Sequence, residues 1–208
     1  MDPNTGKKGM FNKLSKKQAM ELLKKENFKR RTVSFYRYVI LENPDKLRDD
    51  LYADWVKLGV LGRIYLASEG INAQLSVPEQ NWEKFKSKVH SNKYFLNIPF
   101  KIAVEDQRES FFKLTIKVRK QIVADGLKID EYDVTNVGKH LTAEQWNKAM
   151  ENGGTVVDMR NHYESEIGKF KGAICPDVET FQEELPVVKN LLKGKKKEPI
   201  LLYCTGGI

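Results

Sequence analysis

The segment 71–77 alternates between apolar and polar residues without an error, and no other feature restricts the fold as much. Its apolar positions are Ile71, Ala73, Leu75 and Val77. Alternation with a period of two is the pattern of a strand with one buried face and one polar face. We therefore predict a half-buried strand here, entered through a turn at Glu69-Gly70.

The segments on both sides of this strand predict a β-α-β-β-α-β order. Residues 33–41 are rich in β-branched and aromatic residues, which favours a strand, and Asn43-Pro44 then begins a helix. A strand over 63–68 follows that helix. After the alternating strand, a helix from Pro78 and a strand over 99–104 complete the order, which is that of a ferredoxin-like unit.

A further strand, ending at Val118, carries cations on one of its sides. Two explanations stay open for them. Lysines on an edge strand protect the sheet from aggregation, and a row of cations on a sheet face also suits nucleic acid. The candidates for RNA contact, here and on the preceding strands, are Arg37, Arg63, Lys113, Lys117 and Arg119.

The net charge of +8 is concentrated at the N-terminus, in residues 1–31. Ten of these residues are Lys or Arg and three are Asp or Glu, so the rest of the chain is almost neutral. A basic arm favours a polyanion, because each neutralised phosphate releases counterions, and nucleic acid is the leading candidate. The alternative is a solvated tail that aids solubility. Within the arm, residues 15–26 predict a short amphipathic helix with Ala19, Leu22 and Leu23 on one side.

Composition excludes two classes of protein. No apolar run approaches the ~20 residues that span a bilayer, and the N-terminus lacks the apolar region of a secretory signal. The chain has only two cysteines, Cys175 and Cys204, too few for the disulfide framework of a secreted domain. We expect a cytoplasmic protein without a membrane partner. No oligomeric state follows from the sequence.

The second half of the chain predicts a different architecture. After a linker over 125–140, Thr142 and Gln145 form a capping box for a helix, and short apolar strands end at Asp158 and Tyr203. A small strand at Ala173-Ile174 and a helix over 179–193 lie between them. Strands that alternate with helices imply a mostly parallel sheet, whose ligands bind beyond the carboxyl ends of the strands. The predicted fold class is thus α+β over 32–124, followed by α/β over 141–208.

The chemistry of this second domain is concentrated in the last residues of the chain. Cys204 follows a buried strand directly and begins a glycine-containing loop. Such a loop turns backbone N–H groups inward, which stabilises a thiolate and lowers the pKa of the cysteine. Cys204 is therefore a candidate nucleophile or sulfur carrier, and an inert buried cysteine is the alternative. The other loop residues are Thr205, Gly206, Gly207 and Ile208.

These motifs resemble a known family. An ordered set of segments in the second domain is similar to the signatures of a rhodanese domain, and two segments of the first domain are similar to the rhodanese-related tRNA uridine hydroxylases. The rhodanese-like segments are Asp158-Met159-Arg160-Asn161, Tyr163-Glu164, Gly168, Phe170, Gly172-Ala173-Ile174 and Tyr203-Cys204-Thr205-Gly206-Gly207. The segments of the first domain are Phe35-Tyr36-Arg37-Tyr38 and the run from Gly62 to Gln74.

The resemblance implies a partial rhodanese-like domain and a tRNA-modifying enzyme. The implied reaction is the oxygen-dependent hydroxylation of the wobble uridine at C5, with tRNA as partner, molecular oxygen as co-substrate, and neither a metal nor an organic cofactor. Cys204 is the implied catalytic residue, and Asp158 and Arg160 are expected to support the neighbouring loop or to form an ordinary structural salt bridge. Cys175 is assigned to packing, and His162 to the surface rather than to a base.

Two further functions remain open at this point. In the first, Cys204 carries a persulfide and the protein is a sulfurtransferase. In the second, the chain is a non-catalytic RNA-binding module whose cysteine is incidental. Whatever the function, the sheet of the first domain suits an anticodon stem-loop, and Tyr36, Tyr38 and Tyr65 are candidates for stacking on its bases, with core packing as the default for each.

The sequence departs from the family pattern at two points. Lys169 stands where related sequences usually carry His. The chain also stops at Ile208, before the helix that supports a rhodanese loop, so we expect a chain that ends there to be weakly active or inactive.

Overall fold

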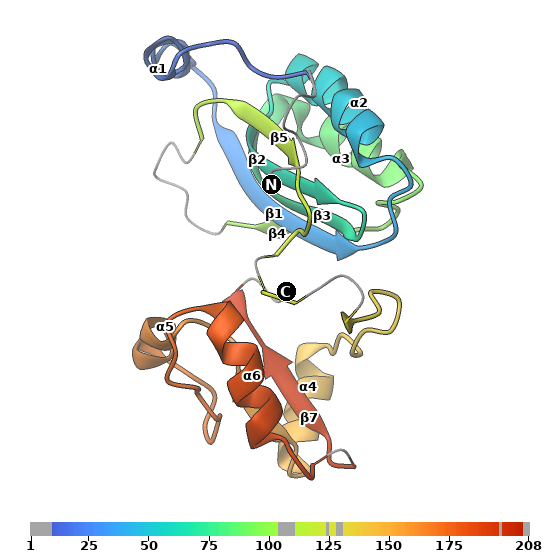
Figure 1. Ribbon diagram of the computed structural model, residues 1–208. Coiled ribbons are helices and arrows are strands. Elements are labelled where there is room, and N and C mark those ends of the chain that lie inside the picture. Colours follow the sequence, from blue (N-terminus) through green and yellow to red (C-terminus); the bar gives the residue numbers. More distant parts are fainter. Residues whose placement is uncertain (1–9, 104–110, 124, 128–130, 196, 206–208) are drawn as a thin grey trace. The chain divides into compact units, whose positions relative to one another are not determined.

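A computed structural model of the chain describes residues 10–103, 111–123, 125–127, 131–195 and 197–205. The chain divides into two compact units, Met1–Val123 and Ala124–Ile208 (Figure 1). It is a mixed α/β protein whose main sheet is mostly antiparallel. Within the described part, no helix has both the length and the apolar composition that crossing a membrane requires.

The first unit is built on a five-stranded sheet with the strand order β4-β1-β3-β2-β5. β1 pairs antiparallel with β3 and β4, β3 pairs antiparallel with β2, and only β5 is parallel to its neighbour β2. The order of β1 to β4 and of the helices between them confirms the predicted β-α-β-β-α-β order. The strands are β1 (Arg30–Tyr38), β2 (Leu61–Ala67), β3 (Gly70–Pro78), β4 (Lys101–Ile102) and β5 (Leu114–Val118).

Two helices, α2 (Pro44–Lys57) and α3 (Trp82–Ser91), cover one face of this sheet (Figure 1). The 3₁₀ turn η1 (Glu79–Asn81) leads into α3. The four apolar positions of the alternating strand, predicted to be buried, are each 0% exposed. They pack with the aromatic side chains of the helices, so the pattern of β3 determines which face of the sheet is the core. The largest contributors from the helices are Trp55, Trp82 and Phe85.

A short helix, α1 (Lys16–Lys24), precedes the sheet. Ser15 caps it in a capping box with Gln18, which satisfies backbone N–H groups at its first turn. Ala19 and Leu23 are buried as predicted, but Leu22 is exposed because it faces away from the unit.

The second unit contains a two-stranded parallel sheet of β6 (Thr155–Asp158) and β7 (Ile200–Tyr203). The predicted capping box of Thr142 and Gln145 is confirmed at the start of α4 (Ala143–Glu151). α6 (Phe181–Leu191) packs its apolar side against β6. A six-residue helix that the sequence did not predict, α5 (His162–Ile167), follows β6.

One predicted feature of this unit differs in detail. The strand expected at Ala173-Ile174 is reduced to a single bridge between Ile174 and Val157, because the chain leaves the sheet at Cys175-Pro176. The described residues of 125–140 contain neither an α-helix nor a strand, as expected of a linker.

Candidate active site

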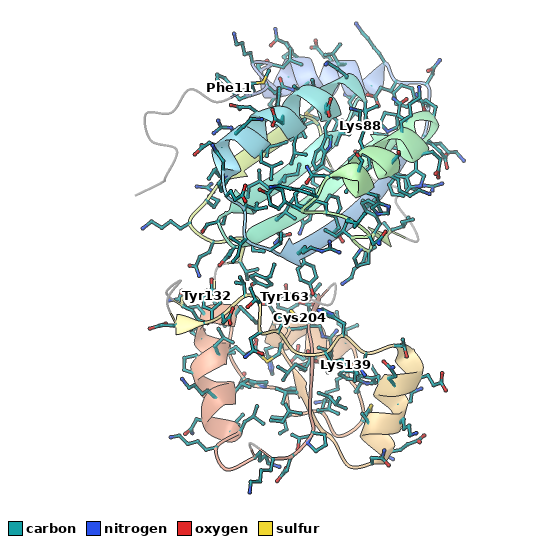
Figure 2. All side chains as sticks on the ribbon, turned by 90° about the vertical axis from the view of Figure 1, so that its right-hand side faces the viewer. Phe11, Lys88, Tyr132, Lys139, Tyr163 and Cys204 are labelled. Atoms are coloured by element: carbon teal, nitrogen blue, oxygen red, sulfur yellow. The ribbon has the colours of Figure 1, made fainter. Side chains whose placement is uncertain are left out.

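Cys204 follows the last residue of β7 and lies half-buried at the carboxyl end of the parallel sheet (Figure 2). Its Sγ donates to the carbonyl oxygen of Met159 at 3.2 Å. The side chain packs against the small apolar cluster of Val157, Met159 and Val188. The thiol is therefore held between the end of β6 and the inner side of α6, at the edge where ligands of parallel sheets bind.

Asp158 ends the neighbouring strand and is the most highly connected side chain of the site. It is buried to 1% exposure. Its Oδ1 accepts from Nε of Arg160 at 2.8 Å, and its Oδ2 accepts from Nη2 of Arg160 at 2.7 Å and from the hydroxyl of Tyr203 at 2.6 Å. Arg160 also donates to the carbonyl oxygen of Gly168 at 2.6 Å, which fixes the loop after α5.

These contacts set the ionisation of the group. Burial opposes the charged form of Asp158, but the hydrogen bonds from Arg160 and Tyr203 outweigh it, so the pKa of Asp158 lies below its ordinary value. The pKa of Tyr203 is raised to about 12 by burial and by its hydrogen bond to Asp158. Asp158 is therefore a fixed anion and Tyr203 a fixed donor at neutral pH. The supporting role expected of Asp158 and Arg160 fits this bidentate geometry.

The loop after Cys204 is tied to α5. The hydroxyl of Thr205 lies 2.9 Å and 2.7 Å from the two carboxylate oxygens of Glu164, to which it donates. The other predicted loop residues, Gly206, Gly207 and Ile208, lie outside the described residues. The N–H nest that they were expected to supply is therefore not part of the described site.

The surroundings of Cys204 are acidic. The pKa of the thiol is raised by its burial and further by the charges of Glu184, Glu164 and Asp158, although the backbone of Thr205 opposes the rise. The shift is opposite to the predicted one, because burial and the carboxylates of Glu184, Glu164 and Asp158 act on the thiol, whereas the loop residues on which the prediction depended, 206–208, lie outside the described part of the chain. In the described arrangement the sulfur is a neutral thiol at neutral pH.

Glu184 is the residue of this site that the sequence analysis missed. It lies on α6, is only 2% exposed, and its Oε1 has no hydrogen-bond partner among the described residues. Burial and the charge of Asp158 raise its pKa to about 7. A carboxyl with these properties exchanges its proton near neutrality, as a general acid or base does.

Three other candidates lie apart from this arrangement. Cys175 is a free, half-buried thiol whose Sγ contacts the carbonyl oxygen of Ala173 at 3.6 Å. His162 lies 3.5 Å from carboxylates of Glu166 and Asp177, and Lys169 is exposed. The described residues contain no cluster of three His, Cys, Asp or Glu side chains that could hold a metal ion.

The structure brings four of the five predicted RNA contacts together on one face of the large sheet. Arg63 and Lys117 point to the face opposite α2 and α3. Lys113 and Arg119 lie just before and just after β5, and the alternation of that strand places them on the same side as Lys117. Arg37 differs, because it shares its side of β1 with Phe35. Its guanidinium donates to the carbonyl oxygens of Leu96 at 2.7 Å and of Tyr94 at 3.4 Å, which gives it a structural role. The prediction of RNA contact remains for the other four.

Comparison with known proteins extends over both units. Residues 30–122 match the family described as the UPF0176 acylphosphatase-like domain, so the first unit is acylphosphatase-like. A tRNA uridine(34) hydroxylase of Leptospira interrogans is 57% identical over 205 residues, which is 98% of this chain and 56% of that protein. A protein of the same name from Yersinia enterocolitica is 44% identical over 201 residues, which is 96% of this chain and 57% of that protein. The chain thus spans about half the length of these relatives.

Among solved structures, the dark state of the BLUF protein BlrB aligns with a TM-score of 0.34 and 12% identity, over 45% of this chain and 75% of that one. This likeness is too weak to bear on function.

Proposed function

The chain belongs to the family of proteins named tRNA uridine(34) hydroxylase, and we propose that it takes part in the same modification of tRNA. The observation that carries the proposal is the identity of 57% over 98% of the chain. A match of that extent includes both the sheet of the first unit and the segment that leads to Cys204. The proposed substrate is then tRNA, and such a substrate supports a cytoplasmic location.

The proposed reaction is a hydroxylation at C5 of the wobble uridine with molecular oxygen as co-substrate. One oxygen atom of molecular oxygen is inserted into the C5–H bond, so that C5 carries a hydroxyl group. The other oxygen atom is reduced to water by two electrons and two protons, which an external two-electron reductant supplies. Neither a metal nor an organic cofactor belongs to the proposal.

The second unit supplies the reactive group and is proposed to be rhodanese-like. Three features support this assignment. β6 and β7 are parallel, Asp158 and Cys204 stand at their carboxyl ends, and a glycine-containing loop follows the cysteine. Cys204 acts as a neutral thiol in this proposal, and Glu184 is the group in the described site with a pKa suited to exchange its proton at neutral pH.

The alternative functions have less support. A persulfide carrier needs a thiolate that attacks its sulfur donor, and the acidic surroundings of Cys204 disfavour that form. A non-catalytic RNA-binding module does not agree with the names of the relatives, which are those of enzymes.

The proposal is tested by complementation. The full-length gene that contains this sequence is expressed in a bacterial strain that makes no 5-hydroxyuridine, and tRNA digests are analysed by mass spectrometry. We expect the parent gene and a Cys175→Ser variant to restore the nucleoside and a Cys204→Ser variant to leave it absent. Restoration by Cys204→Ser would remove the cysteine from the proposal. Failure of the parent gene, together with a persulfide on Cys204 after thiosulfate treatment, would favour the sulfurtransferase.

A further inference from the structure

The face of the large sheet that α2 and α3 leave uncovered carries an ordered row of polar and aromatic side chains, which we call the outer face. Strand register places Tyr36 beside Asn72, Asn72 beside Tyr65, and Tyr65 beside Lys117. The row therefore runs from β1 through β3 and β2 to β5. A second row, one pair of residues further along, consists of Lys101, Ser34, Gln74, Arg63 and Thr115.

The charged side chains that the strands themselves place on the outer face are all cations. None of the five strands contains an Asp or a Glu, whereas Lys101, Arg63 and Lys117 are exposed on them. Lys113 and Arg119 extend the same side of β5 at its two ends. A row of exposed cations attracts phosphates by releasing their counterions.

Each tyrosine of the first row has a cation beside its ring. Nζ of Lys101 lies 5.6 Å from the ring centroid of Tyr36, and the guanidinium of Arg119 lies 5.7 Å from that of Tyr65. Proteins that bind single-stranded RNA use this combination, because a base stacks on the ring while the cation contacts the backbone. A four-stranded β-α-β-β-α-β sheet with aromatic residues on its uncovered face is also the arrangement of a common single-stranded RNA-binding module.

Protection of sheet edges does not account for the outer face. It explains Lys101 on β4 and Lys117 on β5, since both strands form edges. Arg63, Tyr36 and Tyr65 stand on interior strands, where no edge has to be protected. Core packing does not account for them either, because the core lies on the other face.

We propose that the outer face binds a short single-stranded segment of the RNA substrate, with Tyr36 and Tyr65 each stacking on a base and Arg63 and Lys117 contacting phosphates. The inference rests on the proposed function for its substrate. The two rings are two strand spacings apart, about 10 Å, so they receive bases of an extended strand and not neighbours in a duplex. Asn72 between them donates to the carbonyl oxygen of Ile122 at 3.2 Å, so the buried residue Ile122 lies over the row at this point and the rings are reached from its two sides.

The test measures RNA binding directly, without turnover. A fluorescent single-stranded uridine-rich heptanucleotide and a duplex of the same length are titrated with the protein at fixed low salt, and anisotropy is recorded. We expect Tyr36→Leu and Tyr65→Leu each to weaken single-strand binding by roughly 5- to 150-fold. The matching Phe variants keep the ring and should stay within about twofold of the parent. Circular dichroism and thermal melting verify that each variant is folded.

A second comparison isolates the charge. Arg63→Gln should weaken binding and reduce the slope of log affinity against log salt by about 0.7, the value for one phosphate of a single strand. Lys84→Gln is the matched control, because Lys84 is exposed on α3, which covers the opposite face, and it should change neither quantity.

The outcomes separate this inference from the proposed function. Folded Leu variants that bind the single strand like the parent would overturn the inference, and this is the result expected if another part of the protein covers the outer face. Equal affinity for the duplex would overturn it as well. If the protein binds the single strand through these residues but forms no 5-hydroxyuridine, the inference stands and the proposed function fails.

Discussion

The hydroxyl of Tyr203 donates a 2.6 Å hydrogen bond to Oδ2 of Asp158, its direct partner in the parallel register of β6 and β7. Tyr203→Phe keeps the ring, which packs edge-to-face on Phe170 and Trp146, and removes the hydroxyl, which donates to Asp158 and accepts from the N–H of Phe170 at 3.4 Å. We expect the second unit to lose about 1.5–3 kcal/mol of stability at pH 7, the range for a hydrogen bond to a charged group. Hydrogen exchange of the amides of β6 measures the loss.

The effect of this substitution should depend on pH. The folded-state pKa of Asp158 is lowered, so its stabilisation is present above the unfolded value and is lost as pH falls through the folded value. Tyr203→Phe raises that folded pKa, so the loss on acidification should be smaller in the variant and should be complete at a higher pH. Tyr163→Phe is the control, because Tyr163 is 62% exposed. An equal loss in both variants would contradict the role of the buried bond.

Glu184 should make the second unit less stable as pH rises. Its folded-state pKa is about 7 and its ordinary value is 4.5, so between these values the unfolded chain loses a proton that the folded chain keeps. Stability therefore falls from about pH 4.5 and levels off above about pH 7. Glu184→Gln removes the titration, and its urea unfolding midpoints should decline less over this range. Parallel pH profiles of the parent and the variant would show that Glu184 is not buried as described.

The thiol of Cys204 should react slowly at neutral pH. Its pKa is raised, with burial as the largest cause and the carboxylates around it as further causes. In a Cys175→Ser background, the rate of alkylation by iodoacetamide should still be rising above the ordinary thiol pKa. Glu184→Gln should shift this profile to lower pH because it removes one of the charges. A profile that reaches its plateau below pH 7 would show that the thiolate is stabilised by groups outside the described site.

Gly70 is required where β3 begins. Its φ is +151°, and a β-carbon there would lie 2.0 Å from the carbonyl oxygen of Arg37. We expect Gly70→Ala to destabilise the first unit by at least about 2–3 kcal/mol, because the clash involves backbone on the neighbouring strand. Gly138→Ala is the control, since nothing lies within 4 Å of a β-carbon there. Thermal melting compares the two variants, and equal melting temperatures would contradict the expectation.

Several elements were predictable from local patterns alone. The alternation of 71–77 identified β3, because a period of two has no helical equivalent. Thr142 and Gln145 identified the start of α4, because a capping box satisfies the orphan N–H groups of a first turn. The position of Cys204 after a strand followed from the apolar run before it.

Other features depended on contacts between distant segments. α5 has no apolar face that marks it, since Tyr163 and Ile167 are exposed, and six residues leave little periodicity to detect. Glu184 follows Glu183, and two successive acids in a helix predict a solvated face. Only the packing of α6 shows that the side chain of Glu184 is buried. The direction of the Cys204 pKa shift failed for the same reason. The carboxylates that add to the effect of burial, on β6, α5 and α6, are separated from the cysteine by 20 to 46 residues of sequence.

The alternation of β3 separates two kinds of evolutionary change. Its inward residues are fully buried in the core, so substitutions among them alter the stability of the whole unit. Its outward residues, such as Gln74, contribute little to that core, and a change there leaves the register in place. The outer face can therefore acquire a new specificity one residue at a time while the fold beneath it stays the same.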